Sequence, residues 1–159
     1  MLLRQATISD LCAIENCIKA AYFPYIQRMQ QKPAPLLCDY AKIIKLGETF
    51  VLGQLDLALC KTDPHKVIGV LVIQTSSECY LIENVAVHPG AQGQGLGRKI
   101  LEWAEQRALK LGYSVVELYT NKLMHESLKL YKKTGYTVIK TITEDGFERV
   151  YLQKNIVGS

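Results

Sequence analysis

The most informative part of this sequence is Val85-Ala86-Val87-His88-Pro89-Gly90-Ala91-Gln92-Gly93-Gln94-Gly95-Leu96-Gly97-Arg98-Lys99. It reads as a strand, a sharp glycine-rich turn and the start of a predicted helix over residues 96–111. The alternate glycines lack the Cβ atoms that would keep a ligand away from the main chain. Unpaired N–H groups at the start of a helix, together with its dipole, bind anions such as phosphate or pyrophosphate. We therefore predict an anion-binding turn, rather than a tight turn that merely needs glycine.

The spacing of the glycines indicates which anion is expected. A P-loop requires GxxxxGK followed by Ser or Thr, and with Gly90 and Gly95 as its glycines this chain has Leu96 in place of the lysine. A dinucleotide-binding turn requires GxGxxG, whereas the alternate glycines here give GxGxG. Glu117 does lie at about the right distance downstream for a ribose-binding acid, so this alternative stays open. Its position argues against it, because the dinucleotide motif normally opens a domain and about eighty residues precede it here.

Length and composition fit one globular domain. A chain of 159 residues is expected to form a single domain and to bury about 70% of the surface that its unfolded form exposes. The formal charge of +4, with scattered Lys and Arg, is compatible with an acidic ligand and too weak to argue for nucleic acid. No stretch approaches a membrane span, and Arg4, Gln5 and Asp10 interrupt any signal peptide.

Cysteine usage favours a reducing compartment. The five cysteines are odd in number, form no CxxC pair and do not lie at metal-ligand spacing from histidine: Cys12, Cys17, Cys38, Cys60 and Cys79. Neither a disulfide framework nor a zinc site is indicated, and the cysteines are expected to be small buried hydrophobes. We expect a cytoplasmic protein with no metal, no nucleic-acid partner and no membrane partner.

Two helices are predicted before the first long strands. Ser9 is a good N-cap for a helix over residues 10–21, which Pro24 should end or kink. A second helix is expected after Pro35, and Gly47 should end it. Its predicted apolar stripe is Leu37, Tyr40, Ala41 and Ile44.

Strands and turns dominate the rest of the chain. Strands are expected at residues 2–6, 49–52, 55–60, 66–75, 79–87, 115–118, 137–143 and 147–153. The second and third of these form one strand if Gly53 is an irregularity, and Asp63-Pro64 is expected in a turn. Gly112 should close the helix after the loop, and Gly135 the helix over residues 124–134. Asp145-Gly146 predicts a hairpin between the last two strands.

The spacing Gln-x-x-Gly-x-Gly, from Gln92 to Gly97, resembles the coenzyme A pyrophosphate loop of the GNAT N-acetyltransferase superfamily. Before it, Tyr80-Leu-Ile-Glu-Asn-Val-Ala-Val-His-Pro89 is similar to the family's fourth strand. After it, Leu118-Tyr-Thr-Asn121 and Leu130-Tyr131-Lys-Lys-Thr-Gly135-Tyr136 are similar to its fifth strand and the following helix. The resemblance covers residues 80–136, and more loosely the whole chain. It implies an α/β (α+β) fold in which a mixed, mostly antiparallel sheet of roughly six to seven strands is flanked by about four helices, as a single domain over residues 1–159.

The resemblance also implies acetyl-CoA as co-substrate and direct attack by an amine. Such a site must hold the coenzyme, take a proton from the amine, stabilise an oxyanion and help a thiolate leave. Main-chain N–H groups from Gln92 to Arg98, including those of Gln94 and Leu96, would hold the pyrophosphate. By the same resemblance, Val85, Ala86 and Val87 would offer main-chain groups to the thioester, on a strand that splays from its neighbour.

Two more residues are coenzyme-binding candidates by resemblance. Asn121 lies where the family often hydrogen-bonds the pantetheine arm or the adenylate side of the coenzyme, although a plain turn role stays open. Ser127 occupies a position that is often asparagine in the family. Because serine is shorter and has fewer hydrogen-bonding groups, this contact is expected to be weaker or replaced.

Tyr131 is the predicted general acid. It occupies the family's tyrosine position, and a phenol with a pKa near ~10 can give a proton to a thiolate whose conjugate acid lies near ~8.5. Packing on the sheet beside Leu128 is the alternative role. A ping-pong route is not expected, because none of the cysteines lies in the motifs assigned to the site.

Glu83 is the predicted base, because a polar residue is out of pattern in an apolar strand. The alternatives are an ion-pair partner or an anchor for the substrate ammonium group. His88 and His125 are rival bases; His88 precedes a proline at a turn, and His125 opens the Tyr131 helix.

The acceptor is expected to be a small-molecule amine. Tyr22, Tyr25, Arg28 and Tyr40 suggest a pocket with aromatic walls and one cation, although Tyr22 and Tyr25 also fit a core role. A protein amine, a non-catalytic acyl-CoA-binding module and a dinucleotide-dependent oxidoreductase are the alternatives. A homodimer is possible on this sequence.

Overall fold

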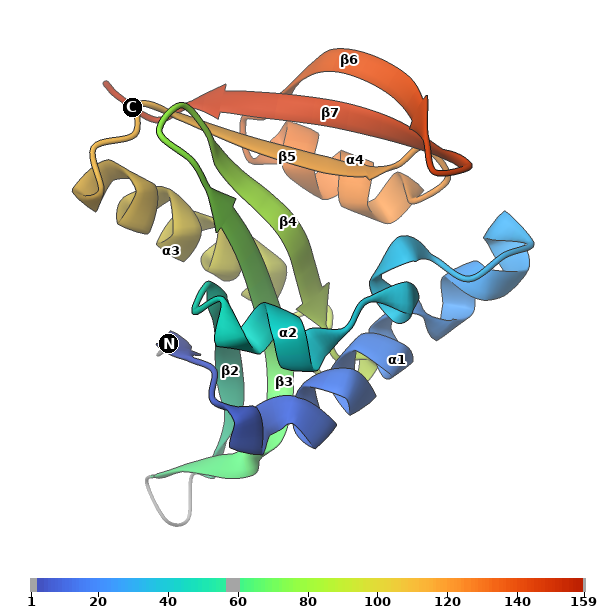
Figure 1. The fold of residues 1–159 in the computed structure, drawn as a ribbon, viewed down its shortest axis with the longest axis vertical. Coiled ribbons are helices and arrows are strands. Elements are labelled where there is room, and N and C mark those ends of the chain that lie inside the picture. The colour runs from blue at the N-terminus through green and yellow to red at the C-terminus, as the bar shows by residue number, and fades with distance from the viewer. Residues whose placement is uncertain (1–2, 57–60, 159) are drawn as a thin grey trace. The chain divides into compact units, whose positions relative to one another are not determined.

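The computed structural model describes residues 3–56 and 61–158. Its strands are β1 (Leu3–Gln5), β2 (Thr49–Asp56), β3 (Lys61–Thr75), β4 (Tyr80–Val87), β5 (Val115–Asn121), β6 (Thr137–Glu144) and β7 (Phe147–Asn155). Its α-helices are α1 (Leu11–Met29), α2 (Tyr40–Lys45), α3 (Leu96–Lys110) and α4 (His125–Lys133), with short 3-10 turns η1 (Ile8–Asp10), η2 (Ala34–Leu37) and η3 (Pro89–Ala91) (Figure 1). In the described part of the chain these strands form one seven-stranded sheet in the order β1-β2-β3-β4-β5-β7-β6. The pair β4–β5 is parallel, whereas β1–β2, β2–β3, β5–β7 and β6–β7 are antiparallel.

The chain divides into two compact units, which we describe separately. The first unit comprises residues 1–72 and 84–100, and the second comprises residues 73–83 and 101–159. The single domain expected from length stays a prediction. None of the helices that the structure describes is both long and apolar enough to cross a membrane.

The core of the first unit lies where α1 and α2 pack on the sheet. Its fully buried side chains include Ile14 and Ile18 from α1, Val51 from β2 and Val70 from β3. The buried residues of α1 recur at helical spacing, so that the helix buries one face. Consecutive residues are buried in β2 and β3, such as residues 50–52 and 70–72, so both faces of these strands are covered.

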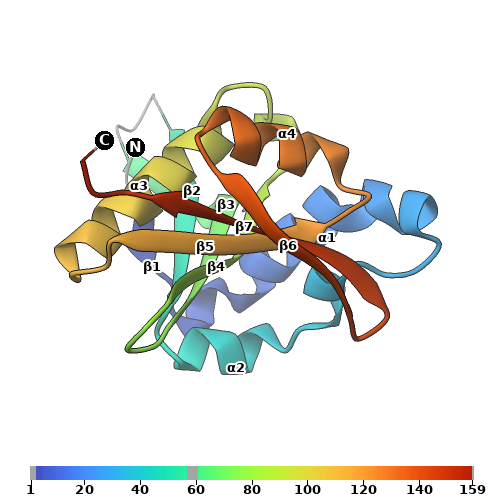
Figure 2. The same ribbon diagram turned by 90° about the horizontal axis from the view of Figure 1, so that it is seen from above.

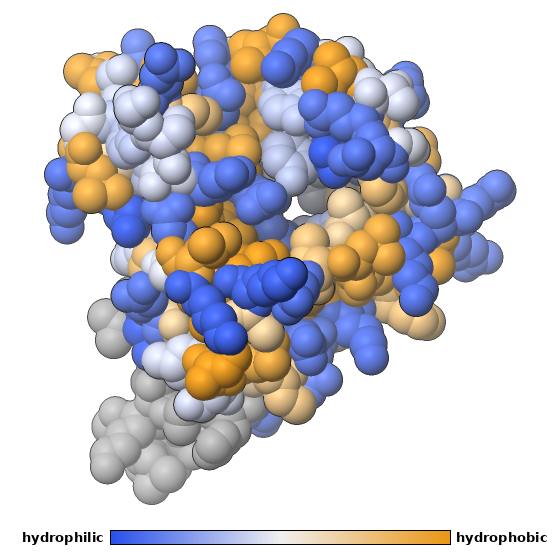
Figure 3. Space-filling model, viewed as in Figure 1, coloured by the Kyte–Doolittle hydropathy of each residue, from blue (hydrophilic) through white to orange (hydrophobic). Residues whose placement is uncertain are grey.

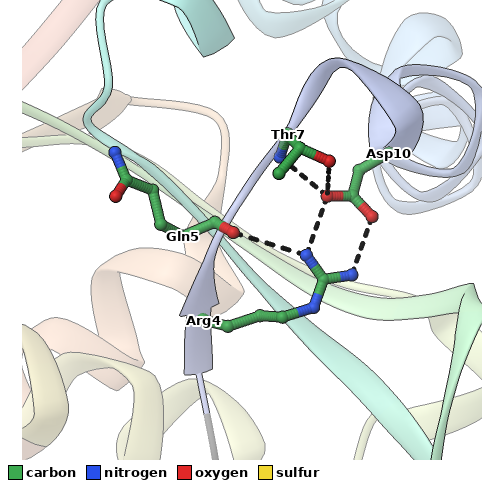
Figure 4. Close-up of polar contacts among 4 residues, drawn as sticks. All are labelled: Arg4, Gln5, Thr7 and Asp10. Atoms are coloured by element: carbon green, nitrogen blue, oxygen red, sulfur yellow. Dashed lines mark hydrogen bonds and ion pairs between the residues drawn. The ribbon is translucent and has the colours of Figure 1, made fainter.

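An ion pair joins β1 to the start of α1. The Arg4 guanidinium donates to both carboxylate oxygens of Asp10, at 2.8 and 2.7 Å, and the Thr7 main-chain N–H donates to the same carboxylate at 2.8 Å (Figure 4). The Asp10 side chain is buried, and these bonds, with that to Arg4 foremost, lower the pKa of its carboxyl. Asp10 thereby stabilises the turn that leads into the first helix.

Helix α1 continues past Pro24, so the end predicted near residue 21 is wrong. Pro24 removes one helical N–H donor, yet it is solvent-exposed and the helix runs on to Met29. Met29 is buried, and the helix stops at Gln30, which has a left-handed φ of 54°. The burial of Met29 therefore helps to offset the local cost of one proline.

The predicted second helix is split in two. Residues 34–37 form η2, and Asp39 then caps α2 by accepting a hydrogen bond from the Lys42 main-chain N–H at 3.2 Å. Tyr40 and Ile44 are buried as expected, whereas Leu37 is exposed. Figure 3 shows apolar side chains interspersed with polar ones over α2 in the first unit.

The β2–β3 hairpin confirms one prediction and overturns another. The register of the pair shifts on both sides of Gly53, so residues 49–56 form one irregular strand as anticipated. The turn expected at Asp63-Pro64 is wrong, because these residues lie inside β3 and Asp63 pairs with Gln54. Residue Cys60 lies outside the described residues.

The second unit contains the antiparallel strands β5, β7 and β6 with α4 beside them (Figure 2). The hairpin turn is Asp145-Gly146, with φ of 50° and 79°, which is the left-handed pair that an Asp-Gly step favours. Buried residues alternate along β5, with Val116, Leu118 and Thr120 on the covered face and half-buried residues between them. Helix α3 ends at Lys110, one residue before the predicted end at residue 111, and Leu111 is exposed.

Candidate active site

Strand β4 carries two adjacent polar residues on opposite faces. Glu83 is exposed, whereas Asn84 is buried among the residues that face the core. The parallel pairing with β5 covers three residue pairs and ends at Ile82 and Leu118, although β4 continues to Val87. The part of β4 that pairs with β5 thus ends directly before Glu83.

The glycine-rich loop has the open geometry that its sequence predicts. Gly93 and Gly95 have φ of 79° and 74°, in the left-handed region. A Cβ atom at either glycine would meet no other atom within 4 Å. Glycine is therefore needed here for backbone conformation, and the space beside the main chain is open.

Helix α3 begins directly after this loop. The Lys99 main-chain N–H donates to the Gly95 carbonyl at 3.1 Å, so the first helical hydrogen bond starts at Gly95. The main-chain N–H groups of Leu96 and Gly97 lie in the first turn, where the helix itself supplies no acceptor. The start of the helix lies close to β3, because a Cβ on Gly69 would meet Ile100 at 3.0 Å. Gly69 was not singled out in the sequence, and its role depends on this close approach.

Gln92 braces the loop against the preceding strand. Its side-chain amide donates to the Val87 carbonyl at 3.0 Å, and its own main-chain N–H donates to the Pro89 carbonyl at 3.3 Å. Gln92, Gln94 and Arg98 are all exposed. The glutamine of the motif therefore shapes the turn, in addition to any contact with a ligand.

His88 is occupied by the turn that follows it. Its Nδ1 accepts a hydrogen bond from the Gly90 main-chain N–H at 3.1 Å, so in the neutral ring the proton lies on Nε2. A neutral imidazole bonded in this way has no second lone pair with which to take a proton, which argues against His88 as a base. His125 is exposed at the first residue of α4.

Asn84 joins both N-terminal helices to β4. Its Oδ1 accepts from the Tyr22 hydroxyl at 2.5 Å, and its Nδ2 donates to the Tyr40 hydroxyl at 3.3 Å. The Tyr40 hydroxyl in turn donates to the Pro35 carbonyl at 2.8 Å, and the Tyr22 hydroxyl lies 3.4 Å from the Val85 carbonyl. The hydroxyls of Tyr22 and Tyr40 are thus both bonded to Asn84, and their role as pocket walls stays a prediction. Asn84 was missed although it breaks the apolar pattern beside Glu83.

Tyr25 and Arg28 follow Tyr22 along α1. The rings of Tyr22 and Tyr25 have centroids 6.2 Å apart, and the Arg28 guanidinium lies 5.1 Å from the centroid of the Tyr25 ring. This stacking at helical spacing holds the cation of Arg28 over an aromatic face.

Tyr131 lies in the second unit, on α4. It is 7% exposed, its ring meets the Tyr136 ring edge-on with centroids 6.2 Å apart, and its carbonyl accepts from the Tyr136 N–H and the Thr134 hydroxyl, both at 3.0 Å. The Tyr136 hydroxyl is buried and donates to Glu105 at 2.9 Å. Burial first, and then the Glu105 carboxylate, raise the pKa of Tyr136, so this second tyrosine stays protonated.

Asn121 and Ser127 flank the start of α4 in the same unit. The Asn121 side-chain oxygen accepts from the Leu123 N–H at 2.9 Å, and its carbonyl accepts from the Met124 N–H at 3.0 Å. Asn121 therefore makes the turn between β5 and α4. Ser127 is half-buried in the first turn of α4.

The predicted site residues divide between the units. The first unit contains the loop, the main chain of residues 85–87 and the aromatic residues of α1, and the second contains Glu83, Asn121, Ser127 and Tyr131. In the first unit, the glycine-rich loop follows soon after the end of β4. In the second unit, Asn121 ends β5, and the following helix α4 carries Ser127 and Tyr131.

The cysteines of the described residues differ in burial and exposure. Burial raises the pKa of Cys17 to about 12, so its thiol is not a nucleophile at neutral pH. Burial, followed by the nearby Glu117 carboxylate, raises the pKa of Cys79, whereas Cys12 and Cys38 are exposed. No three His, Cys, Asp or Glu side chains of the described residues gather as a metal site.

Comparison with known proteins identifies relatives of one kind. A model of the acetyltransferase (GNAT) family matches residues 18–136. The uncharacterized N-acetyltransferase YvbK of Bacillus subtilis is 34% identical over 84 residues, which are 52% of this chain and 54% of that protein. The aminoalkylphosphonate N-acetyltransferase of Salmonella typhimurium is 34% identical over 55 residues, which are 35% of this chain and 36% of that protein. The matched segments thus span about half and about a third of these curated relatives.

Solved structures show the fold. The ribosomal-protein-S18-alanine N-acetyltransferase of Escherichia coli has a TM-score of 0.72 and 20% sequence identity, over 99% of this chain and 95% of that one. At this identity the likeness concerns the fold alone. The predicted fold, a mixed and mostly antiparallel sheet flanked by helices, is confirmed.

Proposed function

This chain belongs to the acetyltransferase (GNAT) family, and we propose that it moves an acetyl group from acetyl-CoA to a small-molecule amine by direct attack. Acetyl-CoA, which the family implies as co-substrate, would supply an activated acetyl thioester. The residues of this chain would hold the coenzyme, take a proton from the amine and return one to the departing thiolate.

The observation that carries the proposal is the open loop at Gly93 and Gly95. Both glycines adopt left-handed φ values, a Cβ at either would point into open space, and α3 begins at once with N–H groups that the helix does not use. Such a loop suits a pyrophosphate, because main-chain donors and the helix dipole act together on one anion. Arg98, exposed in the first turn of α3, adds a positive charge there.

Glu83 is proposed as the base. Its carboxylate is exposed, and Glu83 directly follows the last β4 residue that pairs with β5. An exposed carboxylate can take a proton from an ammonium group directly or through water. The rival His88 is weakened by the hydrogen bond that its Nδ1 accepts from Gly90.

Tyr131 is proposed as the acid. Its main chain and ring are both held by neighbours, which supports a fixed position for its hydroxyl. A phenol of pKa near ~10 keeps its proton at neutral pH and can donate it to a thiolate. Asn121 and Ser127 are proposed to contact the coenzyme from the same unit.

Tyr25 and Arg28 are proposed to face the acceptor. Arg28 is stacked on the Tyr25 ring, which presents a cation and an aromatic surface together on the last turns of α1. A curated relative acts on aminoalkylphosphonates, so small amines with an anionic group are the first acceptors to try.

Coenzyme binding tests the loop. We expect calorimetry to show that acetyl-CoA binds while NADH and NADPH do not, and that Gly95→Ala weakens this binding at least about tenfold. Gly146→Ala is the matched control, because Gly146 has φ of 79° and open space around its Cβ position, yet lies in the hairpin. Preference for the dinucleotides, or an equal loss of acetyl-CoA affinity in both variants, would contradict the assignment of the loop to coenzyme A.

Release of free thiol tests the reaction. Wild-type protein should release thiol from acetyl-CoA with a panel of aminoalkylphosphonates, polyamines, amino acids and peptides, and the preferred amine reports the acceptor class. Tyr131→Phe should lower kcat by about 100-fold, which is typical of losing a general acid, and Glu83→Gln should lower it as well. Tyr113→Phe is the control, since Tyr113 donates to the Ser76 carbonyl and is not assigned to the site. Coenzyme binding without thiol release with any amine would indicate a non-catalytic module.

A further inference from the structure

A charged network is buried in the second unit beside the proposed acid. Tyr136 is 2% exposed and Glu105 is 8% exposed. The Tyr136 hydroxyl donates to Glu105 Oε1 at 2.9 Å, and the Lys154 ammonium donates to Glu105 Oε2 at 2.8 Å. The three residues come from α3, from the turn after α4 and from β7, so the network joins three elements.

Burying this network is expected to contribute less to the free energy of folding than apolar side chains of the same volume would. A phenylalanine ring could fill the same space without an acceptor, whereas a buried hydroxyl and a buried carboxylate are tolerated only when each is paired. Here both oxygens of Glu105 are used, and the Lys154 ammonium also lies 5.7 Å from the centroid of the Tyr136 ring. The Glu105 carboxylate therefore holds the hydroxyl end of Tyr136, and the Lys154 ammonium lies over the face of its ring.

Tyr136 is the neighbour that holds Tyr131. The two rings meet edge-on, with centroids 6.2 Å apart, and the Tyr136 main-chain N–H donates to the Tyr131 carbonyl at 3.0 Å. Gly135 lies after the end of α4 and directly before Tyr136, and it has φ of 96°. It lies against the Lys154 side chain, because a Cβ at Gly135 would be 3.4 Å from Lys154 Cε. Displacement of Tyr136 would therefore be passed to Tyr131 through a ring contact and a hydrogen bond.

We infer that Glu105 and Lys154 are positioning residues that hold the hydroxyl of Tyr131 in place through Tyr136. The inference rests on the proposed function in one respect, the role of Tyr131 as acid. Glu105 and Lys154 act on Tyr131 only through Tyr136. Their effect is to limit the positions that the Tyr131 ring can take.

The first test measures how tightly the Tyr131 ring is held, and it needs no acceptor. In protein with 13C-labelled tyrosine, the Tyr131 ring signal is assigned with Tyr131→Phe, and ring-flip exchange is compared between wild type and Tyr136→Phe. We expect faster flipping of Tyr131 in Tyr136→Phe, because that variant keeps the ring and removes only the bond to Glu105. Unchanged exchange would overturn the inference, whatever reaction the protein catalyses.

The second test is a double-mutant cycle on turnover. Tyr136→Phe should lower kcat about tenfold while the KM for acetyl-CoA stays within about twofold, since misplacement affects the chemical step more than coenzyme binding. In the Tyr131→Phe background the same change should have no further effect on kcat. A role in stability alone would lower activity by the same factor in both backgrounds, and that result would overturn the inference.

The outcomes separate the inference from the proposed function. Failure of wild-type protein to release thiol with any amine would remove the proposed reaction, while the ring-flip measurement still decides on positioning. Active wild-type protein with an unchanged kcat in Tyr136→Phe would remove the inference and leave the reaction standing. Tyr113→Phe, which removes a hydroxyl bonded to Ser76, is expected to leave both readouts unchanged.

Discussion

Each unit of this protein buries a polar network built around tyrosine hydroxyls, and the two networks differ in charge. In the first unit, Asn84 serves both Tyr22 and Tyr40 with one neutral amide. In the second, Tyr136 is served by the Glu105 carboxylate, which in turn requires the Lys154 ammonium. An amide offers one acceptor and one donor group, so it satisfies two different partners without a counter-ion.

The two networks are expected to differ in the free energy of unfolding that is lost when one member is removed. A neutral network that loses one member leaves unsatisfied polar groups, which cost about 1–3 kcal/mol each when buried. A charged network that loses its cation leaves an uncompensated buried charge, which costs more. The second unit is therefore expected to be more sensitive to a single substitution than the first.

The largest effect is expected from removing the cation of the charged network. Lys154→Met should lower the free energy of unfolding by about 3–5 kcal/mol, because the Glu105 carboxylate would stay buried without its partner. Chemical denaturation of wild type and variant would measure this loss. The double variant Lys154→Met with Glu105→Leu should recover much of it, and a loss below that of the next variant would contradict the comparison.

The neutral network should be less costly to break. Asn84→Ala removes the amide that bonds Tyr22 and Tyr40, and we expect the free energy of unfolding to fall by about 2 kcal/mol. The same denaturation experiment applies, with Asn16→Ala as the control at an exposed asparagine of α1. A loss larger than that of Lys154→Met would reverse the order of the two units.

Breaking an ion pair with one exposed partner should lower the free energy of unfolding less than breaking a buried network, and more than breaking a surface ion pair. Arg4 is 41% exposed and Asp10 is 5% exposed by side chain, so Asp10→Asn should cost about 1 kcal/mol at neutral pH. Because the bond to Arg4 lowers the pKa of Asp10 in the folded state, its contribution is present above the unfolded pKa and is lost as pH falls through the folded pKa. Unfolding measured from pH 7 to pH 2 should show the two proteins converging in acid. A constant difference across that range would exclude this linkage.

Breaking a surface ion pair should cause the smallest loss in the free energy of unfolding among these variants. The Lys122 ammonium lies 3.6 Å from Glu148, and both side chains are more than half exposed. Lys122→Ala should change the free energy of unfolding by less than about 0.5 kcal/mol, and added salt should remove the difference. A loss near that of Asp10→Asn would mean that exposure does not explain the order.

The sequence could predict the elements whose residues act locally. The Asp145-Gly146 turn, the loop at Gly93 and Gly95 and the irregularity at Gly53 all depend on conformations that glycine or aspartate favours within a few residues. The order of the later strands and helices follows from the same local patterns. Membership of the family followed from motifs in this well-predicted half of the chain.

The sequence could not predict where distant burial outweighs a local signal. Helix α1 passes Pro24 because Met29 is buried at its end, and Asp63-Pro64 lies in a paired strand although both residues favour turns. The predicted α2 helix begins only at Tyr40, where the Asp39 cap and the burial of Tyr40 coincide. The pairing of Asp63 with Gln54 and the burial of Met29 and Tyr40 depend on neighbouring elements, which lie outside the window in which a pattern is read.

The candidate site divides in the same way. By itself the sequence determined the glycine loop, the polar Glu83 and the tyrosine at position 131, because each stands out from its neighbours in the chain. Only the tertiary structure decided that Tyr22 and Tyr40 are bonded to Asn84 and that Tyr136 is bonded to Glu105. The physical reason is that a hydrogen bond between buried side chains depends on which elements pack together, and residues 31 to 62 positions apart carry no shared local pattern.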